Sequence, residues 1–259
     1  MVALRSTEEA FSILEGILGE VRQTRRAPDW ERYAKIYDLS VGELITYQAL
    51  ITNVLSKVDI RPGMVVVDAA TGTANLIQEL IGIEHDLVVH GFENAPGMLE
   101  IARDKFSGFG TGNIHIHDAD LTQPDWVERV GDGIADLFIS VNTVYTLPDP
   151  LAFFRGARRV LKHGAPFVMS DPTTTVLAPI MVQHLAAGGE FTPVMREMVE
   201  INLDIKAWAE RGRSDDDEEG FDFHSTGVKI TLLEQAGFGV DTFESDYAGV
   251  NTTIVAYAV

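Results

Sequence analysis

Short apolar runs alternate with helix-like stretches along most of the chain. Such alternation predicts an α/β protein whose mostly parallel sheet carries helices on both faces. A further helix ending near residue 237 and two more β-like runs raise the expected number of strands to seven. The strand-like runs lie at 64–68, 87–92, 113–117, 135–141, 165–170, 239–244 and 251–259, and the helix-like stretches at 74–83, 96–107, 124–130 and 149–162.

Two segments with helical periodicity lie outside this alternation of strands and helices, one before it and one within it. Before residue 61, apolar positions recur at helical spacing, and Arg61-Pro62-Gly63 ends the helical region. Within 173–225, the residues from Val194 to Trp208 carry apolar side chains on one helical face. We therefore expect one domain in four parts: a helical cap (1–60), a ligand-binding core (61–172), a helical lid insertion over the ligand edge of the sheet (173–225), and a final helix with two strands (226–259).

The charge balance narrows the class of partner. The chain has 39 acidic and 20 basic residues and a net charge of −19, which argues against a nucleic-acid partner because phosphate binding needs a basic face. Cysteine is absent, so disulfides and thiolate chemistry are excluded, and a reducing cytoplasm is the expected location. No apolar run approaches the length of a membrane span, so no membrane partner is expected. We interpret the acidic run at 214–220 as a solvated loop.

Residues 65–76, VVVDAATGTANL, form a strand, a small-residue turn and the start of a helix. A dinucleotide fingerprint would place glycines at Ala70, Gly72 and Asn75, and two of these positions fail. A phosphate-binding P-loop fails too, because no Lys-Ser/Thr pair follows Gly72. A strand that ends in Asp68 before a small turn suits a ligand with a positive or amine end. The ligand is therefore not expected to be held by a pyrophosphate.

The next two strand-like runs also end in acids. Glu93 lies about 20 residues after the turn, where a carboxylate accepts both hydroxyl hydrogens of a ribose. Asp118 is placed to accept from an adenine amino group, with Asp120 as the alternative register, and Ala119 is expected to leave its backbone N–H accessible. An adenosine without a pyrophosphate is the simplest ligand that satisfies these strand ends.

Four segments in order resemble the motifs of the class I S-adenosylmethionine-dependent methyltransferases, of the type that acts on small molecules. The resemblance covers roughly 28–172 and 226–259, and it implies a Rossmann-like fold with S-adenosylmethionine as the cofactor. WERYAKIYD is similar to a tyrosine-bearing segment of small-molecule members, whereas Ala70 and Ala74 stand where the family usually has glycine. The four segments are VVVDAATGTANL, GFENAPGMLEIAR, HDADL and ADLFISVNTVYTLPDP.

The resemblance implies a cofactor role for ten residues, each by its place in these motifs. They are Asp68, Ala70 and Gly72 along the methionine end, Glu93 on the ribose, Asn94 and Met98 beside the adenine, Asp118 and Ala119 at the adenine edge, Asn142 beside the methionine amine and the acceptor, and Tyr37 over the carboxylate.

The expected reaction is in-line transfer of a methyl group to an O, N or C atom of a small organic metabolite. A general base is needed only if the acceptor must lose a proton. The candidates for that base are His224 and Tyr145, and less strongly His184 and Asp171. No metal ion is expected, and homodimer formation is left open.

Two other functions stay open at this point. One is an S-adenosylmethionine-binding protein without transferase activity, such as a regulatory or cyclisation scaffold. The other is a nicotinamide-dependent oxidoreductase, against which Asn75 and the missing third glycine count.

Overall fold

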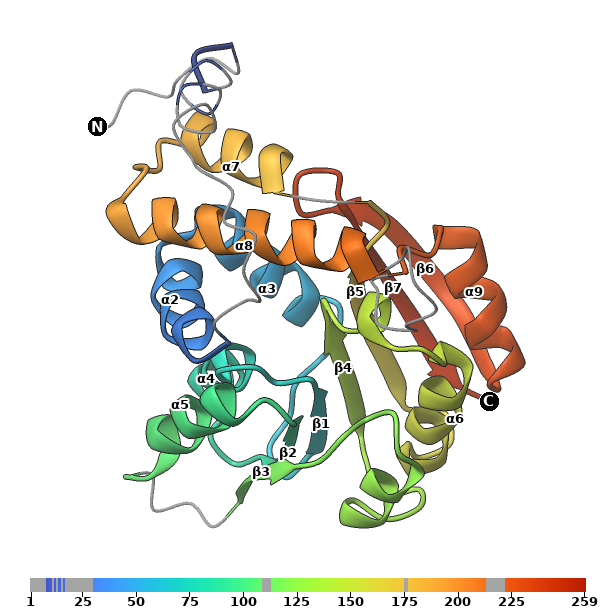
Figure 1. Ribbon diagram of the computed structural model, residues 1–259. Coiled ribbons are helices and arrows are strands. Elements are labelled where there is room, and N and C mark those ends of the chain that lie inside the picture. The colour runs from blue at the N-terminus through green and yellow to red at the C-terminus, as the bar shows by residue number, and fades with distance from the viewer. Residues whose placement is uncertain are drawn as a thin grey trace.

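A seven-stranded sheet lies at the centre of the computed structural model, which describes residues 8–10, 12, 14, 16, 30–108, 113–174, 177–212 and 222–259 (Figure 1). The strand order is β3-β2-β1-β4-β5-β7-β6, in which β7 runs antiparallel to β5 and β6 and the other pairs are parallel. The predicted seven-stranded, mostly parallel sheet is therefore confirmed. The strands are β1 (Val65–Ala69), β2 (Val88–Glu93), β3 (Ile114–Asp118), β4 (Leu137–Val141), β5 (Pro166–Pro172), β6 (Phe238–Asp246) and β7 (Asn251–Ala258).

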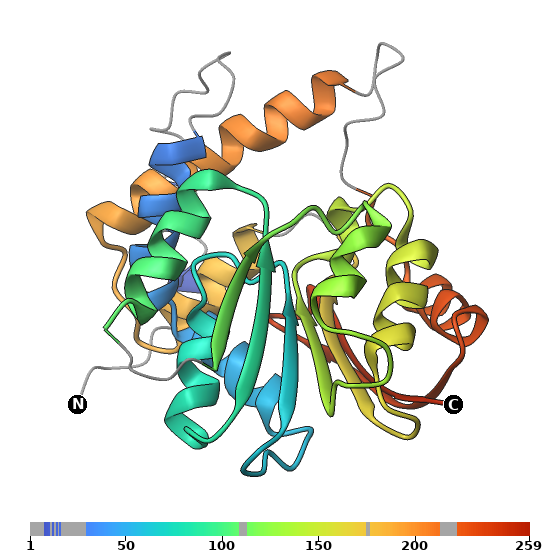
Figure 2. The ribbon, with the colours of Figure 1, turned by 90° about the horizontal axis from the view of Figure 1, so that it is seen from below.

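Successive strand residues point to opposite faces of the sheet and so contribute to two separate cores. In β1, Val66 belongs to an aliphatic core and Val67 to a core rich in phenylalanine. Figure 2 shows the two groups of helices on opposite sides of the strands. The aliphatic side is covered by α3 (Ile45–Leu55), α4 (Asn75–Ile83), α5 (Pro96–Phe106) and α7 (Leu177–Ala186), and the aromatic side by η1 (Pro124–Arg129), α6 (Pro150–Val160) and α9 (Thr226–Gln235).

The aromatic core consists of rings that pack against one another on one face of the sheet. Phe138 contacts Trp126, Phe153 and Phe167 with ring centroids 6.0, 5.8 and 5.3 Å apart. A Cβ on Gly156 of α6 would lie 2.6 Å from Trp126, so glycine lets this helix approach the indole. Full burial of each such side chain contributes about 1.5–3 kcal/mol. The core therefore fixes α6 and η1 against the sheet.

The helices α2 (Trp30–Glu43) and α8 (Pro193–Gly212) form the layer next to the ligand edge. α2 packs against both α5 and α8, with ion pairs from Lys105 to Asp38 at 2.5 Å and from Arg32 to Glu197 at 2.6 Å. Of the helices in the described ranges, none combines the length and apolar composition that a membrane span requires. Most of the expected N-terminal helix and the acidic run at 214–220 lie outside the described residues.

The insertion contains two helices, whereas its periodicity indicated one. The expected amphipathic stretch is α8, and α7 precedes it. Three consecutive residues of α7, Ile180, Met181 and Val182, are buried. A helix that is covered on several sides does not show the apolar stripe by which a surface helix is recognised. This is why α7 was missed from the sequence pattern.

His184 on α7 is a structural residue and not a free base. Its side chain is 1% exposed. Its Nδ1 accepts a hydrogen bond from the Ile45 N–H at 3.2 Å, and its Nε2 lies 3.1 Å from the Glu190 carbonyl oxygen, to which it donates. Both ring nitrogens therefore join α7 to the start of α3 and to the turn before α8. Because both are engaged, the candidate role of His184 in catalysis does not hold.

The turn that covers His184 has no room for a larger residue. A Cβ on Gly189 would lie 2.2 Å from two atoms of the imidazole ring. We expect Gly189→Ala to lower the free energy of unfolding by about 1–3 kcal/mol, because the imidazole or the backbone must shift. Urea unfolding at pH 7 measures this loss. The matched control is Gly227→Ala in α9, where a Cβ would have no neighbour within 4 Å; equal effects of the two substitutions would contradict the packing of the turn.

Candidate functional site

The ends of three neighbouring strands bring the predicted acids together. In the parallel register Glu93 stands opposite Asp118, and the turn after β1 lies beside the end of β2. The Gly72 N–H donates to the Glu93 carboxylate at 3.0 Å, and the Thr71 N–H donates to the Phe92 carbonyl at 2.8 Å. The turn and the two strand ends therefore form one continuous polar edge.

The turn after β1 has an unusual backbone. Ala70, Gly72 and Ala74 have φ values of 53°, 57° and 63°, all in the left-handed region. A left-handed conformation costs an L-residue about 1–2 kcal/mol. The two alanines therefore adopt the conformation for which the family pattern uses glycine, at the expense of local strain. Three residues of the turn are thus left-handed although two of them are alanines.

Asp68 is a buried carboxylate at the end of β1. It is 2% exposed, and its Oδ2 accepts a hydrogen bond from the Thr71 hydroxyl at 2.5 Å. Burial raises the pKa of Asp68 to about 7, and the negative charge of Glu93 adds to this, although the hydrogen bond from Thr71 opposes it. A cation placed beside Asp68 would favour the ionised carboxylate. The geometry therefore suits the positively charged end of a ligand.

Glu93 is held in place by three backbone N–H groups. Its Oε2 accepts from Gly72, and its Oε1 accepts from Asn94 at 2.9 Å and from Ala95 at 2.8 Å. A carboxylate has about four acceptor sites, so with three of them occupied this side chain keeps about one for a ligand hydroxyl group. Met98, predicted to flank the adenine, is 8% exposed on α5, and Asn94 is exposed.

At the end of β3 one expectation is wrong. The backbone N–H of Ala119 is not accessible, because it donates to the Glu93 carbonyl at 3.0 Å. The parallel pairing of β2 and β3 continues one residue beyond the strand and takes up this donor. Asp118 is exposed in register with Glu93. The alternative, Asp120, accepts from the Thr122 N–H at 2.9 Å and so stabilises its own turn, which favours Asp118 as the ligand residue.

Asn142 lies at the end of β4 with a left-handed backbone of φ 55°. Its side-chain oxygen accepts from the Asn251 amide at 2.8 Å, and the same amide nitrogen lies 3.2 Å from the Ser170 hydroxyl. Asn251 is 2% exposed, and its own Oδ1 has no hydrogen-bond partner among the described residues. Sequence reasoning missed Asn251, because its partner lies on a strand 109 residues earlier.

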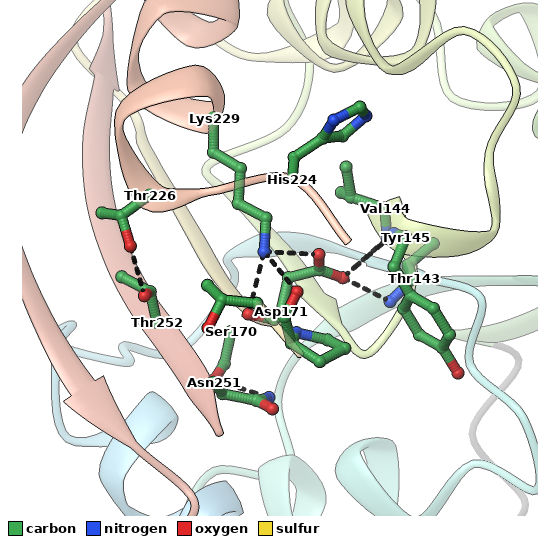
Figure 3. A network of polar contacts seen from close by, with 12 residues as sticks. Thr143, Val144, Tyr145, Ser170, Asp171, His224, Thr226, Lys229, Asn251 and Thr252 are labelled. Carbon is green, nitrogen blue, oxygen red and sulfur yellow. Dashed lines mark hydrogen bonds and ion pairs between the residues drawn. The ribbon is translucent and has the colours of Figure 1, made fainter. Parts of the chain in front are cut away.

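A buried ion pair holds the loop after β4 (Figure 3). The Lys229 ammonium, fully buried on α9, lies 2.8 Å from the Asp171 carboxylate and donates to the carbonyl oxygens of Asp171 and Pro172 at 3.0 and 2.7 Å. The other carboxylate oxygen of Asp171 accepts from the N–H groups of Thr143 and Val144 at 3.1 and 2.8 Å. The pair therefore anchors the start of η2 (Val144–Thr146).

The protonation of this pair follows from its surroundings. Burial raises the pKa of Asp171 and lowers that of Lys229, whereas the attraction between the two opposes both shifts.

Sequence reasoning missed Lys229. The one signal in the sequence was a lysine among apolar residues in a helix, VKITLL.

Five of the six tyrosines gather at the same edge and are called the tyrosine cluster below. The rings of Tyr33 and Tyr37 lie 5.7 Å apart, and Tyr37 covers the turn after β1, 3.9 Å from the position of a Cβ on Gly72. Burial is the main cause that raises the pKa of every member above its usual value. The phenols are therefore neutral near pH 7. The members are Tyr33 and Tyr37 of α2, Tyr47 of α3, Tyr145 of η2 and Tyr247 of the β6–β7 turn.

The two predicted catalytic residues lie in different surroundings. Tyr145 stacks on Phe223 with ring centroids 5.4 Å apart, and its raised pKa suits a neutral hydrogen-bonding phenol better than a base. His224 is partly buried, with Nδ1 3.7 Å from the Asp222 carboxylate. Figure 3 shows the His224 imidazole and the Tyr145 ring pointing in different directions. A catalytic role for either residue stays a prediction.

Residues 60–213 match a family model described as a methyltransferase domain, which covers more than half of the chain. No curated protein matches the sequence.

Solved structures share the fold. A SAM-dependent methyltransferase from Aquifex aeolicus has a TM-score of 0.59 at 18% identity, over 88% of this chain and 98% of its own. Geranyl diphosphate methyltransferase, in complex with GPP and sinefungin, has a TM-score of 0.59 at 12% identity, over 82% of this chain and 79% of its own. The [4+2]-cyclase SpnF has a TM-score of 0.58 at 14% identity, over 89% of this chain and 96% of its own. At these identities the likeness shows the fold alone.

Proposed function

This chain belongs to the class I S-adenosylmethionine-dependent methyltransferases, the cofactor of which is S-adenosylmethionine, and we propose that it methylates a small organic metabolite at an O, N or C atom. The observation that carries the proposal is the shared edge formed by Asp68, Glu93 and the turn between them. A cytoplasmic location and homodimer formation stay predictions.

The residues at this edge fit the cofactor. Asp68 offers a buried carboxylate to an ammonium group, and Glu93 offers its remaining acceptor site to a ribose hydroxyl. Asp118 stands beside Glu93 for the adenine edge. The basic Lys-Ser/Thr pair that a pyrophosphate would need after Gly72 is absent from the sequence. The family match likewise speaks against a nicotinamide-dependent oxidoreductase.

In this reaction the protein binds the cofactor and the acceptor, orients them and encloses them. When bound, the cofactor supplies a methyl group on a sulfonium, an already activated leaving group. Glu93 holds the ribose and Asp68 the amino-acid end of the cofactor, and Tyr37 covers the turn between these two residues. The Asp171–Lys229 pair holds η2, which carries Tyr145 toward the acceptor side. Holding two reactants in attack geometry can supply much of the rate.

The proposal predicts that the protein binds S-adenosylhomocysteine and transfers labelled methyl groups from S-adenosylmethionine. Isothermal titration with S-adenosylhomocysteine measures the first step, and mass spectrometry of a metabolite panel with labelled cofactor measures the second. Failure to bind either form of the cofactor at millimolar concentration would reject the proposal. Tight binding with no labelled product would favour the second candidate, a cofactor-binding scaffold without transferase activity.

Cofactor binding should depend on pH through Asp68. Its pKa is about 7 in the free protein, and an ammonium group beside it would lower that pKa. Binding then releases a proton below pH 7, so the affinity should rise with pH, by about tenfold between pH 6 and pH 8 for one group.

The measurement is calorimetry of S-adenosylhomocysteine in two buffers with different ionisation enthalpies, which counts the released protons. Asp68→Asn should flatten the pH profile and abolish the proton release. An unchanged profile in Asp68→Asn would show that Asp68 does not face the ammonium group.

A further inference from the structure

A chain of polar side chains runs through the core from the end of β4 to the β6–β7 turn. The Asn251 amide nitrogen donates to the Asn142 side-chain oxygen at 2.8 Å and to the Ser170 hydroxyl at 3.2 Å. Thr253 Oγ1 lies 2.9 Å from Ser170 Oγ and 3.0 Å from Asp246 Oδ2. The three middle members, Asn251, Ser170 and Thr253, are at most 2% exposed. They therefore depend on one another for their hydrogen bonds.

The direction of these hydrogen bonds is set by the carboxylate at one end. Asp246 only accepts, so the single hydrogen of the Thr253 hydroxyl goes to it. The Ser170 hydroxyl then donates to Thr253, and its own lone pair is left to accept from an N–H group. Asn251 must therefore turn its nitrogen toward Ser170, and the second hydrogen of that nitrogen meets the Asn142 oxygen.

The Asn251 oxygen bears the cost of this arrangement. It is buried and has no hydrogen-bond partner among the described residues, and such an atom destabilises a folded protein. Rotation of the amide by 180° would bring the oxygens of Asn251 and Asn142 face to face, and it would leave the Ser170 lone pair without a donor. Since the hydrogen-bond network decides how an amide side chain is oriented, the chain fixes both amides.

The nitrogen is consequently the free half of the Asn142 amide. Its oxygen is taken by Asn251, and the side chain is partly exposed at the carboxyl end of β4. We propose that Asn251 is a positioning residue for the cofactor, and that it holds the Asn142 N–H group ready to donate to the carboxylate at the amino-acid end of the ligand. The inference rests on the proposed function and specifies how that end is recognised.

The place of Asn142 in the fold fits this end of the ligand. The Thr143 hydroxyl lies 3.2 Å from the Ala69 carbonyl oxygen, so the end of β4 lies against the end of β1, which carries Asp68. An α-amino acid has an ammonium group and a carboxylate on one carbon atom. Asp68 can accept from the ammonium group, but the ligand carboxylate needs a donor. The Asn142 N–H group supplies that donor, whereas it would repel an ammonium group, which is itself only a donor.

The test compares two ligands by isothermal titration at pH 8. They are S-adenosylhomocysteine and 5′-S-(3-aminopropyl)thioadenosine, an amine analogue that lacks only the carboxylate. Asn251→Leu keeps a similar volume but cannot donate to Asn142. We expect it to weaken the binding of S-adenosylhomocysteine about three- to tenfold, the value of one hydrogen bond, and to leave the amine analogue within about twofold. Unchanged binding of S-adenosylhomocysteine, or equal weakening of both ligands, would overturn the inference.

A double variant shows whether Asn251 acts through Asn142. Asn142→Ala should weaken S-adenosylhomocysteine by a factor similar to that of Asn251→Leu. In the Asn142→Ala background, Asn251→Leu should then change the affinity by less than about twofold, because the group that it positions is gone. Two effects that multiply independently would contradict a positioning role.

Thr252→Val is the matched control for Asn251→Leu. Thr252 is the next residue of β7, is 6% exposed, and its hydroxyl lies 2.7 Å from that of Thr226 on α9. Neighbouring strand residues point to opposite faces of the sheet, so this substitution removes a hydrogen bond of the same strand outside the chain. It should leave the affinity of both ligands unchanged.

Ser170→Ala serves as the second variant if Asn251→Leu does not fold. It removes the hydroxyl that sets the direction of the Asn251 amide. S-adenosylhomocysteine should then bind at least about twofold more weakly, again without an effect on the amine analogue.

The outcomes distinguish this inference from the proposed function. If S-adenosylhomocysteine does not bind to the unsubstituted protein, the proposed function fails and the inference fails with it. If S-adenosylhomocysteine binds and the variants of Asn251 and Ser170 leave its affinity relative to the amine analogue unchanged, the inference alone fails.

Discussion

Lys229→Met is expected to lower the free energy of unfolding by about 3–5 kcal/mol, because it leaves the Asp171 carboxylate buried without its counter-charge. Lys229 is fully buried and Asp171 is 1% exposed. The substitution also removes the donor for the carbonyl oxygens of Asp171 and Pro172. Methionine keeps most of the length and apolar contact of the lysine stem. The loss is measured by urea unfolding at pH 7.

The double variant Lys229→Met/Asp171→Asn tests the cause of that loss. Asparagine removes the buried charge, and its side-chain oxygen can still accept from the N–H groups of Thr143 and Val144. The double variant should therefore be more stable than Lys229→Met alone. A double variant as unstable as the sum of the two single variants would show that the charges do not interact. The exposed Arg159, which pairs with Glu128 and Asp132, gives the control, because Arg159→Met should cost only about 0–1 kcal/mol.

Glu93→Ala is expected to weaken the binding of S-adenosylhomocysteine by about 1.5–3 kcal/mol, the range of hydrogen bonds to a charged group. The carboxylate both offers an acceptor site to the ligand and holds the turn after β1 through the Gly72 N–H. Its loss removes a contact and also frees the turn. Isothermal titration at pH 8 gives the affinity, away from the expected titration of Asp68.

Two further variants make the Glu93 experiment specific. Glu100→Ala, on the exposed surface of α5 a short distance along the chain, changes the net charge equally and should leave the affinity unchanged. Glu93→Gln keeps the acceptor oxygen for one backbone N–H and should fall between Glu93→Ala and the unsubstituted protein. If Glu93→Ala binds as tightly as Glu100→Ala does, the ribose assignment is wrong.

The acidic edge of the candidate site could largely be predicted from local sequence. Asp68, Gly72 and Glu93 stand at strand ends that the apolar runs already mark. The carboxyl ends of parallel strands meet at one edge of the sheet, so residues at those ends are brought together whatever the details of packing. The prediction for Ala119 failed because its N–H depends on pairing with a neighbouring strand, which local sequence does not specify.

The tyrosine cluster and the buried ion pair depend on contacts between distant segments. Tyr33 and Tyr247 are separated by most of the chain, and Lys229 reaches a strand 58 residues earlier. No periodicity marks such residues, because each takes its partner from the packing of α2, α9 or the β6–β7 turn. The second helix of segment 173–225 and the structural role of His184 also depend on such packing, so only the structure shows them.

The sequence by itself determined the strand succession, the helices of the core and the acidic residues at the strand ends, since these follow from alternation of apolar residues and from short motifs. Only the tertiary structure decided which tyrosines meet, which lysine is buried and which backbone groups are already bonded. Those features arise where segments distant in the chain pack together, and their energies depend on burial and proximity, which a linear pattern does not contain.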